Sequence, residues 1–407
     1  MGVGMLTLFG VVLFVVLLLT SVAIHEFGHC VTAKFYGMKV TEYFVGFGPK
    51  IWSFRRGETE YGLKGIPAGG YCKIVGMTDL EELDEVDRER AFYTYSAPKK
   101  VVVLYAGVFL HVLIGLLLFV IAFMGIGRYT PNTSVATVQD CVAADKATVP
   151  CGTSDPASPA KAAGLLKGDR IVAVGPDRVG DWDTASRKIR ASGAGPLVIT
   201  VVRDGKLLNL TANLVTRDRP DLDNPDQTVA VGVLGVGPGY DTAHDGPVAA
   251  TRRSFTTSWM VVEASGSLVK DFPGKVEELF RALGGQDRDQ TGLTGVVGAA
   301  RVSGEFLSLK NTSVTERLSL VVLNVGALNI FLALFNAVPL LPLDGGHVAV
   351  TTYEAAKRRL FRLLGRPDPG RVDISKLLPL TYAFVVLLGA LTVLLLAADI
   401  VNPITVS

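Results

Sequence analysis

Four long apolar runs that contain no Asp, Glu, Lys or Arg constrain the fold of this chain more than any other feature. They cover residues 3–24, 101–127, 318–343 and 377–398. A helix needs about 20 apolar residues to cross a bilayer, so each run predicts one membrane span. The first run lacks a basic flank and exceeds the roughly 7–15 apolar residues of a signal peptide, which favours a retained helix.

The composition fits membrane spans joined to a soluble part. Hydrophobic residues make up 49% of the 407 residues and charged residues 19%, below the roughly 25% charged of soluble proteins. The 40 basic and 38 acidic residues nearly balance, so no nucleic-acid partner is expected. Four cysteines are too few for a disulfide-rich scaffold.

The distribution of basic residues predicts the orientation of the spans. Residues 34–100 and 353–376 are rich in Lys and Arg, whereas the tails 1–4 and 399–407 contain none. Basic loops stay on the cytoplasmic side. We therefore expect both loops in the cytoplasm, and both termini and the long segment 128–315 outside it.

Two cysteines fall in the external segment. Cys141 and Cys151 are ten residues apart, and disulfides persist outside the cytoplasm. The sequence allows a disulfide between them, with two free thiols as the alternative.

Two stretches outside the spans have the pattern of β-structure. Residues 34–97 contain Gly- and Pro-rich turns and alternating runs, which predict a small sheet near the membrane. Residues 135–218 contain short alternating strands, one helix and a hairpin that turns at Asp204-Gly205. Their order resembles a bacterial PDZ domain, a fold that binds an extended peptide along a sheet edge. Another small β-rich domain is the alternative.

A metal-binding pattern directly continues the first span. His25-Glu26-Phe27-Gly28-His29 is an H-E-x-x-H sequence. On a helix its two imidazoles share one face and can bind one Zn²⁺, with Glu26 beside the metal as general base. Ionisable groups inside a span are costly and usually functional. A chance pair of polar helix-end residues is the weaker interpretation.

A catalytic zinc needs a third protein ligand from elsewhere in the chain. Asp344 ends the third apolar run, on the same predicted side as His25 and His29. Pro339 and Pro342 break the helix there and free backbone groups to line a cavity. Asp344 is therefore the preferred candidate. His111 and His347 are alternatives, and His244 lies on the wrong side.

The two motifs together resemble the site-2 proteases, a family of zinc intramembrane metalloproteases. The resemblance rests on H-E-x-x-H in the first span and on the run from Asn336 to Asp344 in the third. It is closest to bacterial members that have four spans and a PDZ domain between the second and third. Residues 46–49 and 67–71 match the membrane-associated β-loop of that family.

The resemblance implies a ligand set of His25, His29 and Asp344 for one Zn²⁺ per chain, with Glu26 as the catalytic glutamate. It also implies that Asn336, Gly69 and Gly70 contact the substrate. His111 stands where the family often has an Asn, so its expected role is a hydrogen bond between helices or an approach to the metal. The implied substrates are single-span membrane proteins such as anti-sigma factors, cut after a first external cleavage.

The predicted fold class is a polytopic α-helical membrane protein with a membrane-associated β-loop and an extracytoplasmic PDZ-like α+β domain, located in the bacterial cytoplasmic membrane. The expected segments are the first span (1–33), the β-loop (34–97), the second span (98–127), the PDZ domain (135–218), a strand with amphipathic helices (219–315), the third span (316–347), a basic loop (348–376) and the fourth span (377–400).

Two other functions remain open at this point. One is a zinc metalloprotease that cuts loops outside the bilayer, although such enzymes typically take a Glu from a following helix as third ligand. The other is a non-catalytic membrane scaffold whose PDZ domain recruits partners. An intact Glu26 argues against the scaffold, which needs no general base.

Overall fold

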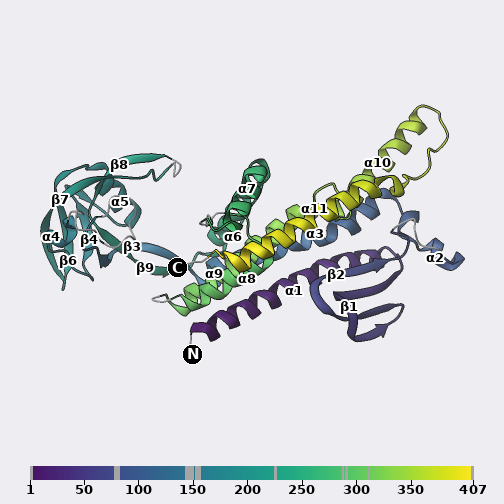
Figure 1. Cartoon of the computed structure of the whole chain (residues 1–407), viewed down its shortest axis with the longest axis horizontal. Helices are drawn as coiled ribbons and strands as arrows, with labels where there is room; N and C mark the ends of the chain where they lie inside the picture. The colour runs from purple at the N-terminus through teal and green to yellow at the C-terminus, as the bar shows by residue number, and fades with distance from the viewer. Residues whose placement is uncertain are drawn as a thin grey trace. The chain divides into compact units, whose positions relative to one another are not determined.

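The chain divides into two compact units in the computed structural model (Figure 1). Unit 1 comprises Met1–Gly127 and His244–Ser407, and unit 2 comprises Arg128–Ala243. The structure describes residues 3–77, 83–142, 151, 157–223, 227–286, 288, 292–309 and 312–404.

Four helices of unit 1, among the described residues, are long and apolar enough to cross a membrane. They are α1 (Val3–Phe35), α3 (Ala97–Val120, continued by the π-helical η2, Ile121–Ile126), α9 (Val314–Asn336) and α11 (Leu378–Val401). The third apolar run extends to residue 343, but its helix ends at Asn336. Pro339 and Pro342 follow, and proline lacks an N–H donor and disfavours helical geometry in the residue before it.

Unit 1 contains further helical elements among the described residues. They are α2 (Glu85–Glu89), η1 (Phe92–Thr94), α6 (Pro247–Lys270), α7 (Phe272–Leu283), α8 (Val296–Ser308), α10 (Asp344–Leu363) and η3 (Ile374–Leu377). Helix α3 packs against α1, α9, α10 and α6, so it lies at the centre of the bundle. The segment 348–376, expected as a basic loop, instead holds most of α10.

A twisted hairpin of β1 (Val40–Arg56) and β2 (Thr59–Ile74) forms the small sheet expected within residues 34–97. Each strand bends, so that segments of one strand pair with two different segments of the other. Residues 42–45 pair on one side with 60–63 and on the other with 70–73, and 60–63 also pair with 52–55. Residues 70–74 thus form one edge of the sheet, and no other described strand pairs with them.

Unit 2 is built on one antiparallel sheet with the strand order β8-β7-β6-β4-β3-β9, with β5 paired to β4. Its elements are β3 (Arg128–Val138), α4 (Pro159–Ala162), β4 (Arg170–Val174), β5 (Asp177–Arg178), α5 (Trp182–Ala191), β6 (Gly195–Arg203), β7 (Lys206–Pro220), β8 (Thr228–Val233) and β9 (Val236–Ala243). The unit is longer at both ends than the expected range 135–218, because β9 pairs with β3 and β8 pairs with β7.

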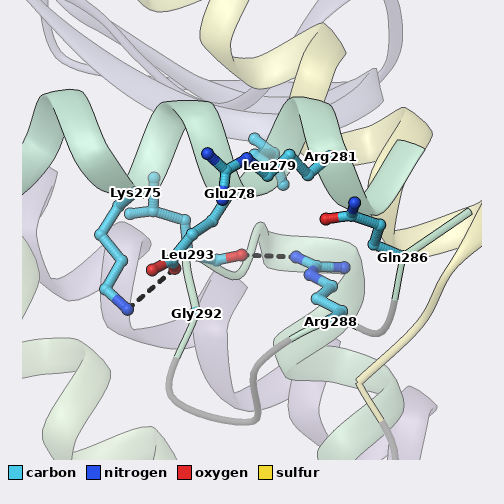
Figure 2. Close-up of a pocket in the computed structure, with 8 residues that line it drawn as sticks. All are labelled: Lys275, Glu278, Leu279, Arg281, Gln286, Arg288, Gly292 and Leu293. Atoms are coloured by element: carbon cyan, nitrogen blue, oxygen red, sulfur yellow. Dashed lines mark hydrogen bonds and ion pairs between the residues drawn. The ribbon is translucent and has the colours of Figure 1, made fainter. Parts of the chain in front are cut away.

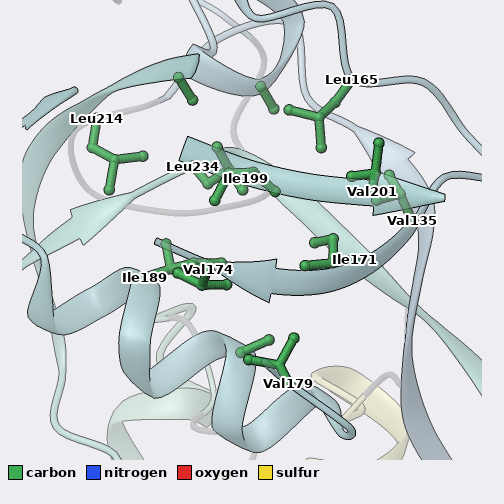
Figure 3. Packing of buried hydrophobic residues seen from close by; sticks show 13 residues of the cluster. Val135, Leu165, Ile171, Val174, Val179, Ile189, Ile199, Val201, Leu214 and Leu234 are labelled. Atoms are coloured by element: carbon green, nitrogen blue, oxygen red, sulfur yellow. The ribbon is translucent and has the colours of Figure 1, made fainter. Parts of the chain in front are cut away.

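The core of unit 2 lies between α5 and the sheet (Figure 3). Ile171, Ile199 and Val201 are fully buried there. The hairpin of β6 and β7 turns at Asp204-Gly205, where both residues have positive φ (49° and 75°), as a two-residue turn with Gly prefers. Cys141 and Cys151 form a disulfide whose Cα atoms are 5.9 Å apart.

One buried ion pair ties the sheet of unit 2 to the turn before β4. The carboxylate of Asp169 accepts hydrogen bonds from Nε and Nη2 of Arg203, at 2.7 and 2.8 Å, and from the backbone N–H of Leu166. The Arg203 guanidinium holds the pKa of the Asp169 carboxyl below its usual range, despite burial. The pair therefore stabilises unit 2 at neutral pH.

Candidate metal centre

The H-E-x-x-H residues lie in the second half of α1. His25 and His29 are one helical turn apart and both are buried, with 5% and 7% of their surface exposed. Their Nε2 atoms lie 3.1 Å apart. The predicted sharing of one helix face is confirmed, and the two imidazole nitrogens point at the same location.

Asp344 reaches these nitrogens from a different helix. It is the first residue of α10, after the turn that follows α9. Its Oδ2 atom lies 3.3 Å from Nε2 of His25 and 3.4 Å from Nε2 of His29. The two motifs, more than 300 residues apart in the sequence, therefore meet at one point.

Two glycines after Asp344 allow α10 to fold back against the preceding turn. A Cβ atom on Gly345 would stand 2.3 Å from the carbonyl oxygen of Ala337, and one on Gly346 would stand 2.4 Å from backbone atoms of Leu340. Real Cβ atoms do not approach backbone so closely. The Asp-Gly-Gly sequence is thus needed to bring the carboxylate to the histidines.

Gly107 of α3 packs directly on the two imidazoles. A Cβ atom there would stand 2.5 Å from Cε1 of His25 and 2.5 Å from Nε2 of His29. Gly28 makes the matching approach from α1, because its Cβ would lie 3.0 Å from the carbonyl of Ala106. Close contact between α1 and α3 therefore depends on glycine in both helices.

The backbone of α3 fixes the orientation of His29. Nδ1 of His29 lies 2.8 Å from the carbonyl oxygen of Val103. A carbonyl only accepts, so Nδ1 carries the proton and Nε2 presents its lone pair in the neutral ring. Metal-binding histidines commonly donate their second nitrogen in this way.

The three donor atoms fit a tetrahedral zinc site. Metal–ligand bonds of ~2.0–2.1 Å give a tetrahedron with edges of about 3.3–3.4 Å, and the measured separations are 3.1, 3.3 and 3.4 Å. Oδ2 of Asp344 is buried without a hydrogen-bond partner of acceptable geometry among the described residues. Such an atom suits a cation, because a buried unpaired carboxylate oxygen is otherwise costly. Two imidazoles and one carboxylate leave a fourth position open, as in catalytic zinc sites.

Glu26 lies between the three donor atoms and the edge of the small sheet. A Cβ atom on Gly70 would stand 3.2 Å from Cγ of Glu26 and 3.5 Å from Cγ1 of Val22 in the same helix. Strand β2 thus passes directly beside the candidate base. Asn336 is the last residue of α9 and is half-buried there; Gly69 adopts a φ of +131° in β2, which favours glycine.

His111 joins α3 to α9 next to the metal ligands. Its Nδ1 lies 2.9 Å from Oδ1 of Asn329, and its ring centroid lies 4.6 Å from that of His25. Asn329 in turn donates to Oγ of Ser21 in α1. His111 therefore hydrogen-bonds across helices, and its ring also packs at a tilt against that of His25. His347 is outside the three-residue cluster, and His244 contacts the backbone of Met124.

Sequence reasoning missed the residues that shape the site without binding to it. Gly107 and Gly28 are small residues within apolar helices. Their position near polar residues is the only sequence feature that could have indicated their role in packing around the site. Asn329 is one of three asparagines in the third run, and it could have been paired with His111. No sequence pattern predicts the contact of His29 with the carbonyl of Val103.

A separate cavity in unit 1 is lined by α7 and the segment before α8 (Figure 2). None of its lining residues belongs to either motif. Its basic side chains are held by neighbours: Lys275 pairs with Glu278, Arg281 with Glu277, and Arg288 with Asp399. Among the residues that the structure describes there, the cavity offers no second arrangement of ligand or catalytic groups.

Comparisons with known proteins agree with this geometry. The profile of peptidase family M50 matches residues 13–364. The chain is 37% identical to the zinc metalloprotease Rip1 of Mycolicibacterium smegmatis, over 98% of both chains, and 38% identical to Rip1 of Mycobacterium tuberculosis, over 97% of this chain and 98% of the relative. A putative zinc metalloprotease of Brucella suis is 28% identical over 84% of this chain and 85% of its own length.

Replacement of Gly107 by Ala tests the packing of the site. The added Cβ must push both imidazoles aside, so we expect zinc affinity to fall by about 10–100-fold, as for other residues that support metal ligands. Zinc content of the detergent-purified chain, measured by mass spectrometry across a chelator series, reports the change. Gly125→Ala is the matched control, because nothing lies within 4 Å of its Cβ position. Equal zinc affinity in the two variants would contradict the packing argument.

Proposed function

The chain belongs to peptidase family M50 and is a zinc metalloprotease, and from this premise we propose that it is an intramembrane endopeptidase of the site-2 type. One observation carries the proposal: the H-E-x-x-H residues of an apolar helix and an Asp after a second apolar helix converge on one buried point. A protease that cuts loops outside the bilayer would not need its metal-binding residues buried between apolar helices.

We assign His25, His29 and Asp344 as the ligands of one zinc ion and Glu26 as the catalytic residue. Zinc, when bound, supplies a Lewis acid that polarises a carbonyl and lowers the pKa of water toward neutrality. The carboxylate of Glu26 accepts the proton of the attacking water and then donates it to the leaving amine. Val103 and Gly107 hold the imidazoles in place throughout.

The substrate must be extended at the site of cleavage, because a helix hides its amides in internal hydrogen bonds. The edge of β2 at residues 70–74 lies beside Glu26, and an extended segment can add to such an edge. Gly69 and Gly70 then allow the substrate backbone to approach, and Asn336 donates a side-chain hydrogen bond to it. Exposed Ile51, Trp52 and Phe54 (71%, 56% and 46%) support a membrane-associated sheet.

Unit 2 is proposed to be a PDZ-like domain outside the cytoplasm. A groove lies between α5 and the end of β8, lined by Trp182, Ile189 and Arg190 and by residues 231–236. Strand β8 is an edge strand, so an extended peptide can pair with it there. This role suits docking or selection of substrate ends produced by an earlier external cut.

The proposed substrates are single-span membrane proteins, with anti-sigma factors as the class that the family resemblance suggests. The proposed location is the bacterial cytoplasmic membrane, with both termini and unit 2 on the outer side. The excess of Lys and Arg in residues 34–100 and 353–376 supports this orientation.

Replacement of Glu26 by Gln separates catalysis from scaffolding. The amide keeps the shape of the side chain but cannot take a proton from water. We expect cleavage of a single-span test substrate in proteoliposomes to fall by at least about 100-fold, the lower range for loss of a general base, while zinc content stays unchanged. Cleavage at the wild-type rate would contradict the role of Glu26.

Proline at the edge of β2 tests substrate pairing. Tyr71→Pro places a proline in the edge strand beside Glu26, where it disturbs the backbone that an extended substrate would pair with. Phe54→Pro is the matched control, because it also replaces an aromatic residue but lies in the strand at the opposite edge. We expect Tyr71→Pro to lower cleavage by about tenfold relative to the control, near the value of one hydrogen bond, with zinc retained in both. Equal cleavage by the two variants would count against edge pairing.

A further inference from the structure

Two free cysteines lie on facing elements next to the proposed base. Cys30 follows His29 in α1 and is 1% exposed, and Cys72 lies in β2 and is half-buried. Both cysteines pack in one apolar cluster with Met38 and Ile74. Neither thiol has a part in the hydrolysis described above.

The spacing of helix and strand explains why these two residues meet. Cys30 is one turn beyond Glu26, a rise of about 6.0 Å along α1. Cys72 is two residues beyond Gly70, a rise of about 6.6 Å along β2 on the same side of the strand. Gly70 faces Glu26, so Cys72 faces Cys30. Strand β2 thus runs beside α1 in register.

The two thiols differ in how accessible they are to a reagent from solution. Cys30 is enclosed in the cluster, against which Tyr61 also packs, and the Tyr61 hydroxyl accepts a hydrogen bond from Lys34 at 2.7 Å. Cys72 is partly open at the sheet edge. A reagent from solution therefore reaches Cys72 first, and Cys30 is placed to react with it afterwards.

We propose that Cys30 and Cys72 form a reversible disulfide that regulates the edge strand of the protease. This inference rests on the proposed function for its effect on cleavage, but not for formation of the bond. The oxidant is a low-molecular-weight disulfide. The Cys72 sulfur attacks it and releases one thiol, and the Cys30 sulfur then displaces the second thiol from Cys72. The two protons leave on the released thiols.

The disulfide between Cys30 and Cys72 reduces the space beside Glu26 in which the substrate must lie. A disulfide brings the two sulfurs to ~2.05 Å, well inside non-bonded contact. It therefore draws β2 toward α1 one residue pair away from Glu26 and Gly70, which are already in contact. An extended segment can then no longer enter beside Glu26, so the oxidised enzyme cleaves more slowly.

The test uses the full-length, zinc-loaded chain in detergent, treated with oxidised or reduced glutathione. Peptide mapping by mass spectrometry without reduction is expected to find a linkage between Cys30 and Cys72 that reduced glutathione removes. Cleavage of dye-labelled unfolded casein, an extended-chain probe, is expected to fall at least fivefold on oxidation and to recover on reduction. In Cys30→Ser the linkage cannot form, and the ratio of reduced to oxidised activity is expected to approach one.

A double replacement of Cys141 and Cys151 by Ser is the control, and it is expected to respond to glutathione as the wild type does. Absence of the Cys30–Cys72 linkage in oxidised protein overturns the proposal, as does a linkage that leaves cleavage unchanged. Loss of the response in the double variant also overturns it, because the effect then belongs to the other disulfide. Failure of the reduced enzyme to cleave the probe contradicts the proposed function instead, while peptide mapping still decides whether the bond forms.

Discussion

Two imidazoles and a carboxylate buried between apolar helices cost free energy that only close mutual contact or a bound cation can offset. His25, His29 and Asp344 satisfy that constraint with donor atoms 3.1–3.4 Å apart. Since the carboxylate comes from a helix far along the chain, the whole bundle must hold α1 and α10 in one fixed relation. The other features of unit 1 follow from this requirement.

Glycine residues allow most of the close backbone contacts that position the metal ligands. Gly107 and Gly28 bring α1 and α3 together around the imidazoles, and Gly345 and Gly346 fold the start of α10 against the turn after α9. Gly70 allows β2 to lie against Glu26. An added Cβ atom would stand 2.3–2.5 Å from neighbouring atoms at Gly107, Gly345 and Gly346, and 3.0 Å from backbone atoms at Gly28 and Gly70, so neighbouring groups would have to shift in each place. The site is therefore built by backbone proximity as much as by its polar side chains.

Much of this arrangement could be predicted from the sequence, because its signals are local. Uncharged apolar runs predicted the four helices, and the H-E-x-x-H spacing predicted the shared face of His25 and His29. The pairing with Asp344 required an argument about topology and a family resemblance. Pro339 and Pro342 indicated that the third helix breaks before Asp344. The helical start of α10 and the support from Gly107 depend on tertiary packing, for which a single sequence carries no signal. The same holds for the contact between Cys30 and Cys72.

The central claim is that the first and third apolar helices contribute to one metal site. Zinc content of the detergent-purified full chain, measured by mass spectrometry for the wild type, Asp344→Ala and Asp368→Ala, tests it most directly. Asp368 is exposed in the segment after α10, so its replacement controls for loss of a carboxylate. We predict about one zinc per chain in the wild type and in Asp368→Ala, and a strong loss in Asp344→Ala. Full retention of zinc without Asp344 would contradict the account.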